Sequence, residues 1–305
     1  TVPFTDYIKN VASREIYPTW PESALRANIY AQISLALNRI YTEYYRTRGY
    51  PFDITAPTAY DQYFVPNRDI FENVRTIAAE LFDNYIRRIG SVEPLFAQYC
   101  NGTTTTCNGL SQWGSVSLAE EGLTPFDILT YYYGDDIELV RNAPVDQPEG
   151  SAPSIPLQLG STGDEVRTLQ IRLNRISSNY PSIPKILATD GIFTNDTDAA
   201  VRRFQEIFNL TPDGIVGKAT WYTIQNFYIG VKRLNDLSSE GITQEEVTRQ
   251  YPGVLESGSV GNGVRNLQYF LAYLSQFYDT IPAPAVDGVF GEETREAVVD
   301  AQRTF

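Results

Sequence analysis

A duplicated segment in the second half of the chain constrains the fold more than any other feature. Three motifs occur there in a fixed order, and each returns about 97 residues later. The first copies are Leu159-Gly-Ser-Thr-Gly-Asp-Glu-Val-Arg-Thr-Leu-Gln170, Asp190-Gly-Ile-Phe193 and Ala200-Val-Arg-Arg-Phe-Gln205. The second copies are Ser257-Gly-Ser-Val-Gly-Asn-Gly-Val-Arg-Asn-Leu-Gln268, Asp287-Gly-Val-Phe290 and Ala297-Val-Val-Asp-Ala-Gln302. Because order and spacing are both kept, we infer a structural unit that is repeated once.

Each copy is predicted to be helical. In the first copy, two sets of apolar residues recur at the spacing of one helix face. They are Val166, Leu169, Leu173 and Ile176, and then Ala200, Val201, Phe204 and Phe208. Residues 217–225 predict a third short helix that carries Trp221. The second copy reaches Phe305 before a matching third helix, so we expect it to be incomplete at its C-terminal end.

The preceding residues predict a further helical domain. Residues 22–48 and 69–89 place apolar or small side chains at helical spacing, whereas residues 50–65 predict a loop with minor β-structure. Residues 144–156 contain four prolines and predict a linker. We therefore expect a mainly α protein with the following regions: a domain over 1–143, the linker over 144–156, a three-helix module over 157–234, a connector over 235–253 and a second module over 254–305.

Composition excludes several classes of function. The net charge of −13 would repel phosphate groups, so nucleic acid is excluded as a partner. No run of 18 apolar residues occurs, so we expect no membrane span. The chain has no histidine, which removes Ser-His-Asp and Cys-His nucleophile systems and every His-ligated metal site. It also has no methionine, so we expect a processed protein or a fragment, with any signal peptide outside it.

The repeated motifs resemble the peptidoglycan-binding domain of bacterial cell-wall hydrolases. Besides the duplicated motifs, the first copy contains Asp213-Gly-Ile-Val-Gly-Lys-Ala-Thr-Trp221. The resemblance covers residues 157–234 fully and 255–305 in part. It implies peptidoglycan as the partner and Trp221 as a contact to it. The alternative is that these residues are only the core and turn residues of a three-helix unit.

The N-terminal domain resembles the stage II sporulation protein D family, which includes amidase enhancers. Four segments carry this resemblance: Val11-Ala-Ser-Arg-Glu-Ile-Tyr-Pro-Thr-Trp-Pro-Glu-Ser-Ala-Leu-Arg-Ala-Asn28, Gly109-Leu-Ser-Gln-Trp-Gly114, Leu118-Ala-Glu-Glu-Gly122 and Ile128-Leu-Thr-Tyr-Tyr-Tyr133. The resemblance implies a helical catalytic-type domain in an extracellular protein of the cell wall or spore envelope. It also implies cleavage of the glycan strand by a lytic transglycosylase route.

That route needs one carboxylic acid, which first donates a proton and later accepts one. The family's glutamate falls on Glu15, for which the alternative is a solvated surface acid. Glu22 is the second candidate. Thr19 and Glu22 have the spacing of a capping box, and Arg26 follows Glu22 by four residues, so we expect a structural role for Glu22. The substrate contacts that the resemblance implies in this domain are Trp20, Gln62, Ser111, Gln112 and Trp113.

The usual zinc site of that family is missing. Where members carry Thr-Thr-His-Cys-Gln, this chain has Thr58-Ala-Tyr-Asp-Gln62, and Cys107-Asn108 replaces a His-Gly pair. We therefore expect no cofactor, and a local disulfide between Cys100 and Cys107. The alternative is a poorer metal site, such as zinc held by both cysteines and Asp61.

Three functions stay open at this point. The first is a peptidoglycan-binding lytic transglycosylase. The second is a wall-binding scaffold or amidase activator whose catalytic domain is degenerate, as the lost zinc ligands suggest. The third is a zinc amidase or peptidase, against which the absence of histidine argues.

Overall fold

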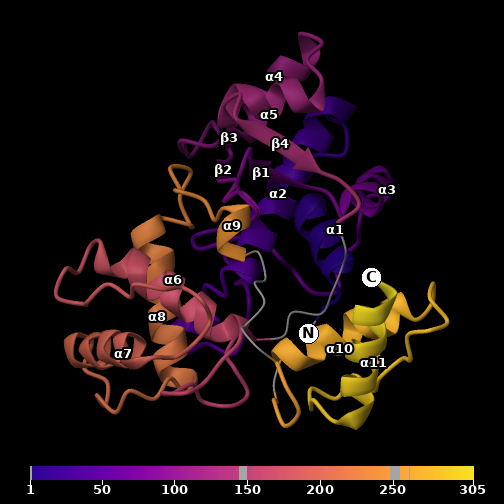
Figure 1. Ribbon diagram of the computed structural model, residues 1–305. Coiled ribbons are helices and arrows are strands. Elements are labelled where there is room, and N and C mark those ends of the chain that lie inside the picture. Colours follow the sequence, from indigo (N-terminus) through magenta and orange to yellow (C-terminus); the bar gives the residue numbers. More distant parts are fainter. Residues whose placement is uncertain (1, 144–149, 248–254, 261) are drawn as a thin grey trace. The chain divides into compact units, whose positions relative to one another are not determined.

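The computed structural model describes residues 2–143, 150–247, 255–260 and 262–305 and is mainly helical, which confirms the predicted fold class (Figure 1). The chain divides into two compact units. Unit 1 contains residues 1–151 and 225–245, and unit 2 contains residues 152–224 and 246–305. Within the described ranges, we find no helix that is both long enough and apolar enough to cross a bilayer.

The helices and strands of unit 1 surround one central helix. In chain order they are α1 (Phe4–Glu15), α2 (Glu22–Tyr41), a 3₁₀ turn (Arg46–Arg48), α3 (Glu72–Leu81), β1 (Tyr85–Arg88), β2 (Tyr99–Cys100), β3 (Leu110–Ser111), α4 (Gln112–Glu120), α5 (Pro125–Tyr133), β4 (Ile137–Val140) and α9 (Gln244–Val247, which begins at the end of this unit). Helix α2 contacts α1, α3, α4, α5 and β1 (Figure 1). A helix that is covered on all sides is expected to be apolar around most of its surface, and α2 has apolar residues on all its faces.

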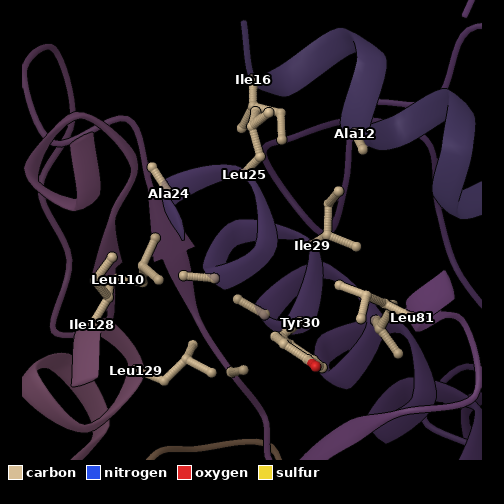
Figure 2. Close-up of a cluster of buried hydrophobic side chains, with 14 of the residues drawn as sticks. Ala12, Ile16, Ala24, Leu25, Ile29, Tyr30, Leu81, Leu110, Ile128 and Leu129 are labelled. Atoms are coloured by element: carbon tan, nitrogen blue, oxygen red, sulfur yellow. The ribbon is translucent and has the colours of Figure 1, made fainter. Parts of the chain in front are cut away.

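The core of unit 1 forms around α2. Figure 2 shows Leu25, Ile29 and Tyr30 of α2 among side chains from other elements, such as Leu110 and Ile128. Several polar residues of α2 are also buried, among them the amides Asn28 and Gln32. Because buried amides need hydrogen-bond partners, their positions mark places where α2 meets polar groups of other segments.

The predicted helix over 69–89 is wrong at its C-terminal end. Helix α3 ends at Leu81, and β1 pairs with β4 in antiparallel register, with Tyr85 opposite Val140. The backbone N–H of Ile86 also donates to Ser34 Oγ at 2.8 Å. Pairing with a strand about 50 residues away overrides the local helical spacing. Strands β2 and β3 form a separate parallel pair, in which Tyr99 is opposite Leu110.

Both predicted connecting segments lie in part outside the described residues, at 144–149 and 248–254. The start of the expected connector over 235–253 packs on unit 1, where the Val92 N–H donates to the Ile242 carbonyl at 2.8 Å and the Ile242 N–H donates to the Glu93 carboxylate at 2.7 Å. Asn38 also donates to the Leu234 carbonyl at 3.0 Å. Residues 225–245 are therefore part of unit 1, although they follow the first repeat in sequence.

The repeats show the helices that the motifs predict. Helices α6 (Asp164–Ser177), α7 (Asn195–Ile207) and α8 (Lys218–Lys232) belong to the first copy, and α10 (Asn262–Leu274) and α11 (Glu292–Thr304) to the second. The division between the two units falls inside α8, after Ile224. The predicted apolar face of α6 is completely buried at Val166, Leu169, Leu173 and Ile176. In the second copy, Leu271, Ile281 and Ala297 form a smaller core.

Candidate active site

Glu15 lies at the end of α1, where the helix stops abruptly. The next residue, Ile16, has an extended backbone (φ −126°, ψ 155°), and Pro18 disfavours a helical backbone at Tyr17. This break leaves the partly buried Glu15 side chain beside α2, β2 and the loop at Tyr63.

Three neutral groups donate hydrogen bonds to the Glu15 carboxylate. The Tyr99 hydroxyl donates to Oε2 at 2.5 Å, and Gln32 Nε2 donates to the same oxygen at 2.9 Å. The backbone N–H of Tyr63 donates to Oε1 at 2.7 Å. Among the described residues, no salt bridge reaches this carboxylate.

Burial raises the pKa of Glu15 above its ordinary value, and the three donors offset only part of that effect. Desolvation disfavours a carboxylate, whereas hydrogen bonds to it favour the charged form. A carboxyl group with a raised pKa can hold its proton closer to neutral pH and donate it. Glu15 therefore has the electrostatic setting that a general acid needs.

A second layer of side chains supports this carboxylate. Gln62 Nε2 donates to the Tyr99 hydroxyl at 3.2 Å, and the Tyr7 hydroxyl donates to Gln62 Oε1 at 3.0 Å. Gln62 is completely buried, so its side chain has no exposed surface for the substrate contact that the resemblance implies. It contacts Tyr99 instead, and through Tyr99 it acts on Glu15.

Tyr17 and Trp20, which follow Glu15 closely in the sequence, form an aromatic cluster with Trp113 of α4. The ring centroids of Trp20 and Trp113 are 5.0 Å apart, and Tyr17 lies 5.6 Å from Trp20 and 5.7 Å from Trp113. Tyr17 and Trp113 are 57% and 39% exposed, whereas Trp20 is 8% exposed. Exposed aromatic faces can stack on sugar rings, so Tyr17 and Trp113 are the members of the cluster that a saccharide can reach. The buried Trp20 ring packs against both of these exposed rings.

Other predicted contacts are buried or used in the fold. Gln112 is 6% exposed and Trp221 is 2% exposed, so neither presents a surface to a ligand. Ser111 begins α4 and accepts a hydrogen bond from the Gly114 N–H at 2.9 Å. A Cβ at Gly114 would lie 2.1 Å from the Tyr132 hydroxyl, so the glycine is required by close packing.

Glu22 is the first residue of α2 and has an exposed side chain. Arg26 bonds Glu22 at 2.7 Å and Glu80 at 2.7 Å, so the predicted contact four residues away is present. The predicted capping box is wrong, because Pro21 occupies the N-cap and no side chain caps this helix. A capping box occurs instead at Thr124 and Asp127 of α5.

Cys100 and Cys107 form a disulfide, so neither offers a thiolate to a metal. The loop that they close borders an open pocket of about 310 Å³, lined also by Gly102, Ser111 and Tyr131. Because side chains alternate along a strand, Cys100 and Ser111 lie on the opposite face of the β2–β3 pair from Tyr99. The pocket is thus separate from the Glu15 carboxylate.

Asp61 does not fit the zinc site of the resembled family. Its carboxylate is completely buried and pairs with Arg39 at 2.8 Å. It also accepts hydrogen bonds from the Tyr45 hydroxyl at 2.5 Å and from the N–H and hydroxyl of Thr55 at 2.9 Å and 2.6 Å. In the described part of the chain, no group of three or more His, Cys, Asp or Glu side chains is arranged to hold a metal ion. We assign no step to a metal at this position.

Three partners of Glu15 were not predicted: Tyr99, Gln32 and the backbone of Tyr63. The only usable signal was Gln32, a polar residue that falls between apolar residues such as Ile29 and Ile33 of α2. Nothing in the sequence marks Tyr99, because an aromatic residue in a strand is ordinarily a packing residue.

Comparison with known proteins identifies the repeats. The family of peptidoglycan binding domains matches residues 162–224 and 260–305. Among characterised proteins, the chain is 47% identical over 68 residues to a zinc D-Ala-D-Ala carboxypeptidase of Streptomyces albus G, covering 22% of this chain and 25% of that protein. It is 34% identical over 144 residues to the N-acetylmuramoyl-L-alanine amidase CwlL of Bacillus licheniformis, covering 47% of this chain and 38% of the amidase.

Among solved structures, the SleB N-terminal domain matches 26% of this chain and 99% of its own length at 31% identity, with a TM-score of 0.22. The chain spans only about a quarter and two fifths of the lengths of the carboxypeptidase and the amidase. What the family match establishes is confined to the repeats: this protein carries a peptidoglycan-binding domain, represented in two segments of its second half.

Proposed function

We propose that this protein binds peptidoglycan through its repeats and cleaves the glycan strand as a lytic transglycosylase, with Glu15 as the single acid and base. One observation carries the proposal. Glu15 stands at the position of the family's acid, in a partly buried site where only neutral groups contact its carboxylate. Resemblance to the stage II sporulation protein D family supplies the type of reaction, and the repeats supply the polymer.

The geometry suits both halves of such a reaction. In the first half, protonated Glu15 donates its proton to the glycosidic oxygen as the bond to the anomeric carbon breaks. In the second half, the Glu15 carboxylate accepts a proton from a hydroxyl of the same sugar, which closes an internal anhydro ring. The three donors stabilise the carboxylate that exists between these steps, and burial favours its return to the acid form.

The remaining regions support this role. The exposed rings of Tyr17 and Trp113 lie within a few residues of Glu15 and of the β3–α4 junction, respectively, and offer stacking surfaces for sugar rings. Two weak binding modules on one chain raise the local concentration of the polymer. A protein of this kind acts outside the cell, at the cell wall or the spore envelope.

Two other functions are alternatives that the experiment described below distinguishes from this proposal. A wall-binding scaffold or amidase activator is favoured by the engagement of Asp61 and of both cysteines in the fold. An amidase or carboxypeptidase is suggested by the names of the two relatives, but a chain without histidine lacks the usual zinc ligands of such enzymes.

Mass spectrometry of muropeptides after incubation of the full chain with purified peptidoglycan separates these functions. Anhydro products indicate a transglycosylase, new reducing ends a hydrolase and free stem peptides an amidase. We expect anhydro products, and we expect Glu15→Gln to lower their rate of release by about 10²–10⁴. Binding to insoluble peptidoglycan should be unchanged in that variant, because the repeats are far from Glu15 in sequence.

Glu22→Gln is the matched control. It removes a carboxylate from an exposed ion pair and should change the free energy of unfolding by about 0.5 kcal/mol or less, with no effect on the rate. Anhydro products released normally by Glu15→Gln but not by Glu22→Gln would transfer the catalytic role to Glu22. Binding without any product from the unmutated chain would favour the scaffold.

A further inference from the structure

A chain of hydrogen bonds behind Glu15 has a direction that the structure fixes. Gln62 Nε2 lies 2.9 Å from the backbone carbonyl of Gln32, and a carbonyl oxygen can only accept. The amide atom at that position must therefore be the nitrogen, and the other amide atom, which accepts from Tyr7, must be the oxygen. The orientation of Gln62 thus follows from its partners.

The orientation of Gln62 fixes the Tyr99 hydroxyl in turn. Because Gln62 Nε2 can only donate, the Tyr99 oxygen accepts on that side. A hydroxyl has one hydrogen, and the other partner of Tyr99 is Glu15 Oε2 at 2.5 Å. The Tyr99 hydrogen therefore points at Oε2, in a chain of donors that runs from Tyr7 through Gln62 and Tyr99 to Glu15.

The two oxygens of Glu15 are consequently not equivalent. Oε2 accepts from both Tyr99 and Gln32, which uses the two lone pairs of that oxygen. Within the described ranges, Oε1 accepts only the backbone N–H of Tyr63, a residue that is 47% exposed. One lone pair of Oε1 is left over, on the side of the exposed loop.

We propose that Tyr99 is a positioning residue for Glu15: with Gln62 and Tyr7 behind it, Tyr99 keeps Oε2 as a permanent acceptor, so that Oε1 is the oxygen that carries and transfers the proton. The catalytic part of this inference rests on the proposed function. The hydrogen-bond part does not, because it concerns where Glu15 holds its proton.

The groups around Glu15 keep this direction over the working pH range. Burial and the neighbouring Glu15 carboxylate raise the pKa of Tyr99 well above its ordinary value, and burial raises the pKa of Tyr7 as well. Asp61 also acts on Tyr7 but is paired with Arg39. Both tyrosines therefore stay protonated while Glu15 titrates.

The test is a titration of the full-length protein labelled with ¹³C at the glutamate carboxyl carbons and observed by NMR. The Glu15 signal is assigned by its loss in Glu15→Gln. Tyr99→Phe removes a donor that favours the carboxylate, so the midpoint of the Glu15 titration should move to higher pH. Tyr7→Phe removes the most distant donor and should give a smaller shift in the same direction.

Tyr133→Phe is the matched control. Tyr133 is also a buried tyrosine of unit 1, but its hydroxyl donates to the Gln98 carbonyl at 2.9 Å and not to the chain behind Glu15. It should lose stability without moving the midpoint. A midpoint that stays in place or falls in Tyr99→Phe, or that moves as far in Tyr133→Phe, would overturn the proposal.

Release of anhydro-muropeptides provides the second readout. Tyr99→Phe should lower the rate by about tenfold or more, because the carboxyl loses its fixed orientation. The pH at which activity declines on the alkaline side should rise together with the NMR midpoint. If the unmutated chain releases no product, the proposed function fails and the titration alone decides the hydrogen-bond part. If product is released but the midpoint does not respond to Tyr99→Phe, the inference fails and the proposed function stands.

Discussion

The repeats and the surroundings of Glu15 both bury glutamines, but they use them differently. In the repeats, Gln170, Gln205 and Gln268 each bind a turn that is followed by a threonine, and we call these three the turn-binding glutamines. Each Oε1 accepts the N–H of a turn glycine, and each Nε2 donates to a carbonyl and to a threonine hydroxyl at the start of the next helix. All their bonds close within one repeat.

Around Glu15, the bonds of the buried glutamines lead to an ionisable group. Gln32 donates directly to the Glu15 carboxylate. Gln62 donates to the Tyr99 hydroxyl, and that hydroxyl donates to the same carboxylate. Burial of a polar side chain therefore does not identify a site. What distinguishes the two regions is where the hydrogen bonds end, at a turn of the backbone or at a partly buried carboxyl group with a raised pKa.

The largest expected difference between the two regions is in stability. Gln170→Leu leaves the Gly191 N–H and the Ile192 carbonyl without their partner inside the repeat. An unsatisfied buried polar group costs about 1–3 kcal/mol, and we expect a loss of that size in the free energy of unfolding. Urea denaturation of the full chain measures it. The rate of glycan cleavage per folded molecule should not change, and a loss of rate without a loss of stability would remove the distinction.

Gln32→Leu should show the opposite pattern. The backbone carbonyl of Gln32, which holds Gln62, is kept in this variant, but the donor to Glu15 Oε2 is lost. We expect the rate to fall about tenfold, equivalent to about 1.4 kcal/mol, with the alkaline decline in activity moved to higher pH. A shift to lower pH would show that the amide oxygen of Gln32, and not its nitrogen, faces the carboxyl.

Much of this difference between the repeats and the surroundings of Glu15 could not be predicted from the sequence. Helical spacing predicted the buried face of α6, because those apolar residues contact neighbours within the same repeat. It failed at Tyr85–Arg88, where the partner strand is far away in the sequence. The resemblance of the motifs singled out Glu15 as the catalytic acid. It also implied that Gln62, Gln112 and Trp221 contact substrate, but these three side chains are buried. A recurring motif indicates that its residues are needed for the fold or for a ligand. The burial of each side chain in the structure distinguishes the two roles.

Glu15 should also make stability depend on pH. Its pKa is raised in the folded protein, so the folded state binds a proton more tightly than the unfolded state. That contribution is complete below the ordinary pKa of 4.5 and is lost as the pH rises through the folded value. Glu15→Gln should therefore gain thermal stability over the unmutated chain as the pH is raised from 4 to 8. If the melting temperature of Glu15→Gln instead falls relative to that of the unmutated chain as the pH rises, the carboxyl group does not have a raised pKa.

The smallest expected effect is at Gln302, which the repeat aligns with Gln205. In the first copy, the Gln205 side chain binds the turn at Asp213 and Gly214 and is 1% exposed. In the second copy, the Gln302 side chain is exposed. Two residues at the same place in the repeat thus differ in whether a turn covers them. Gln205→Ala should cost about 1–3 kcal/mol of unfolding free energy, whereas Gln302→Ala should change it by less than about 0.5 kcal/mol. A loss at Gln302 as large as that at Gln205 would show that the contacts with the turn are not what makes Gln205 stabilising.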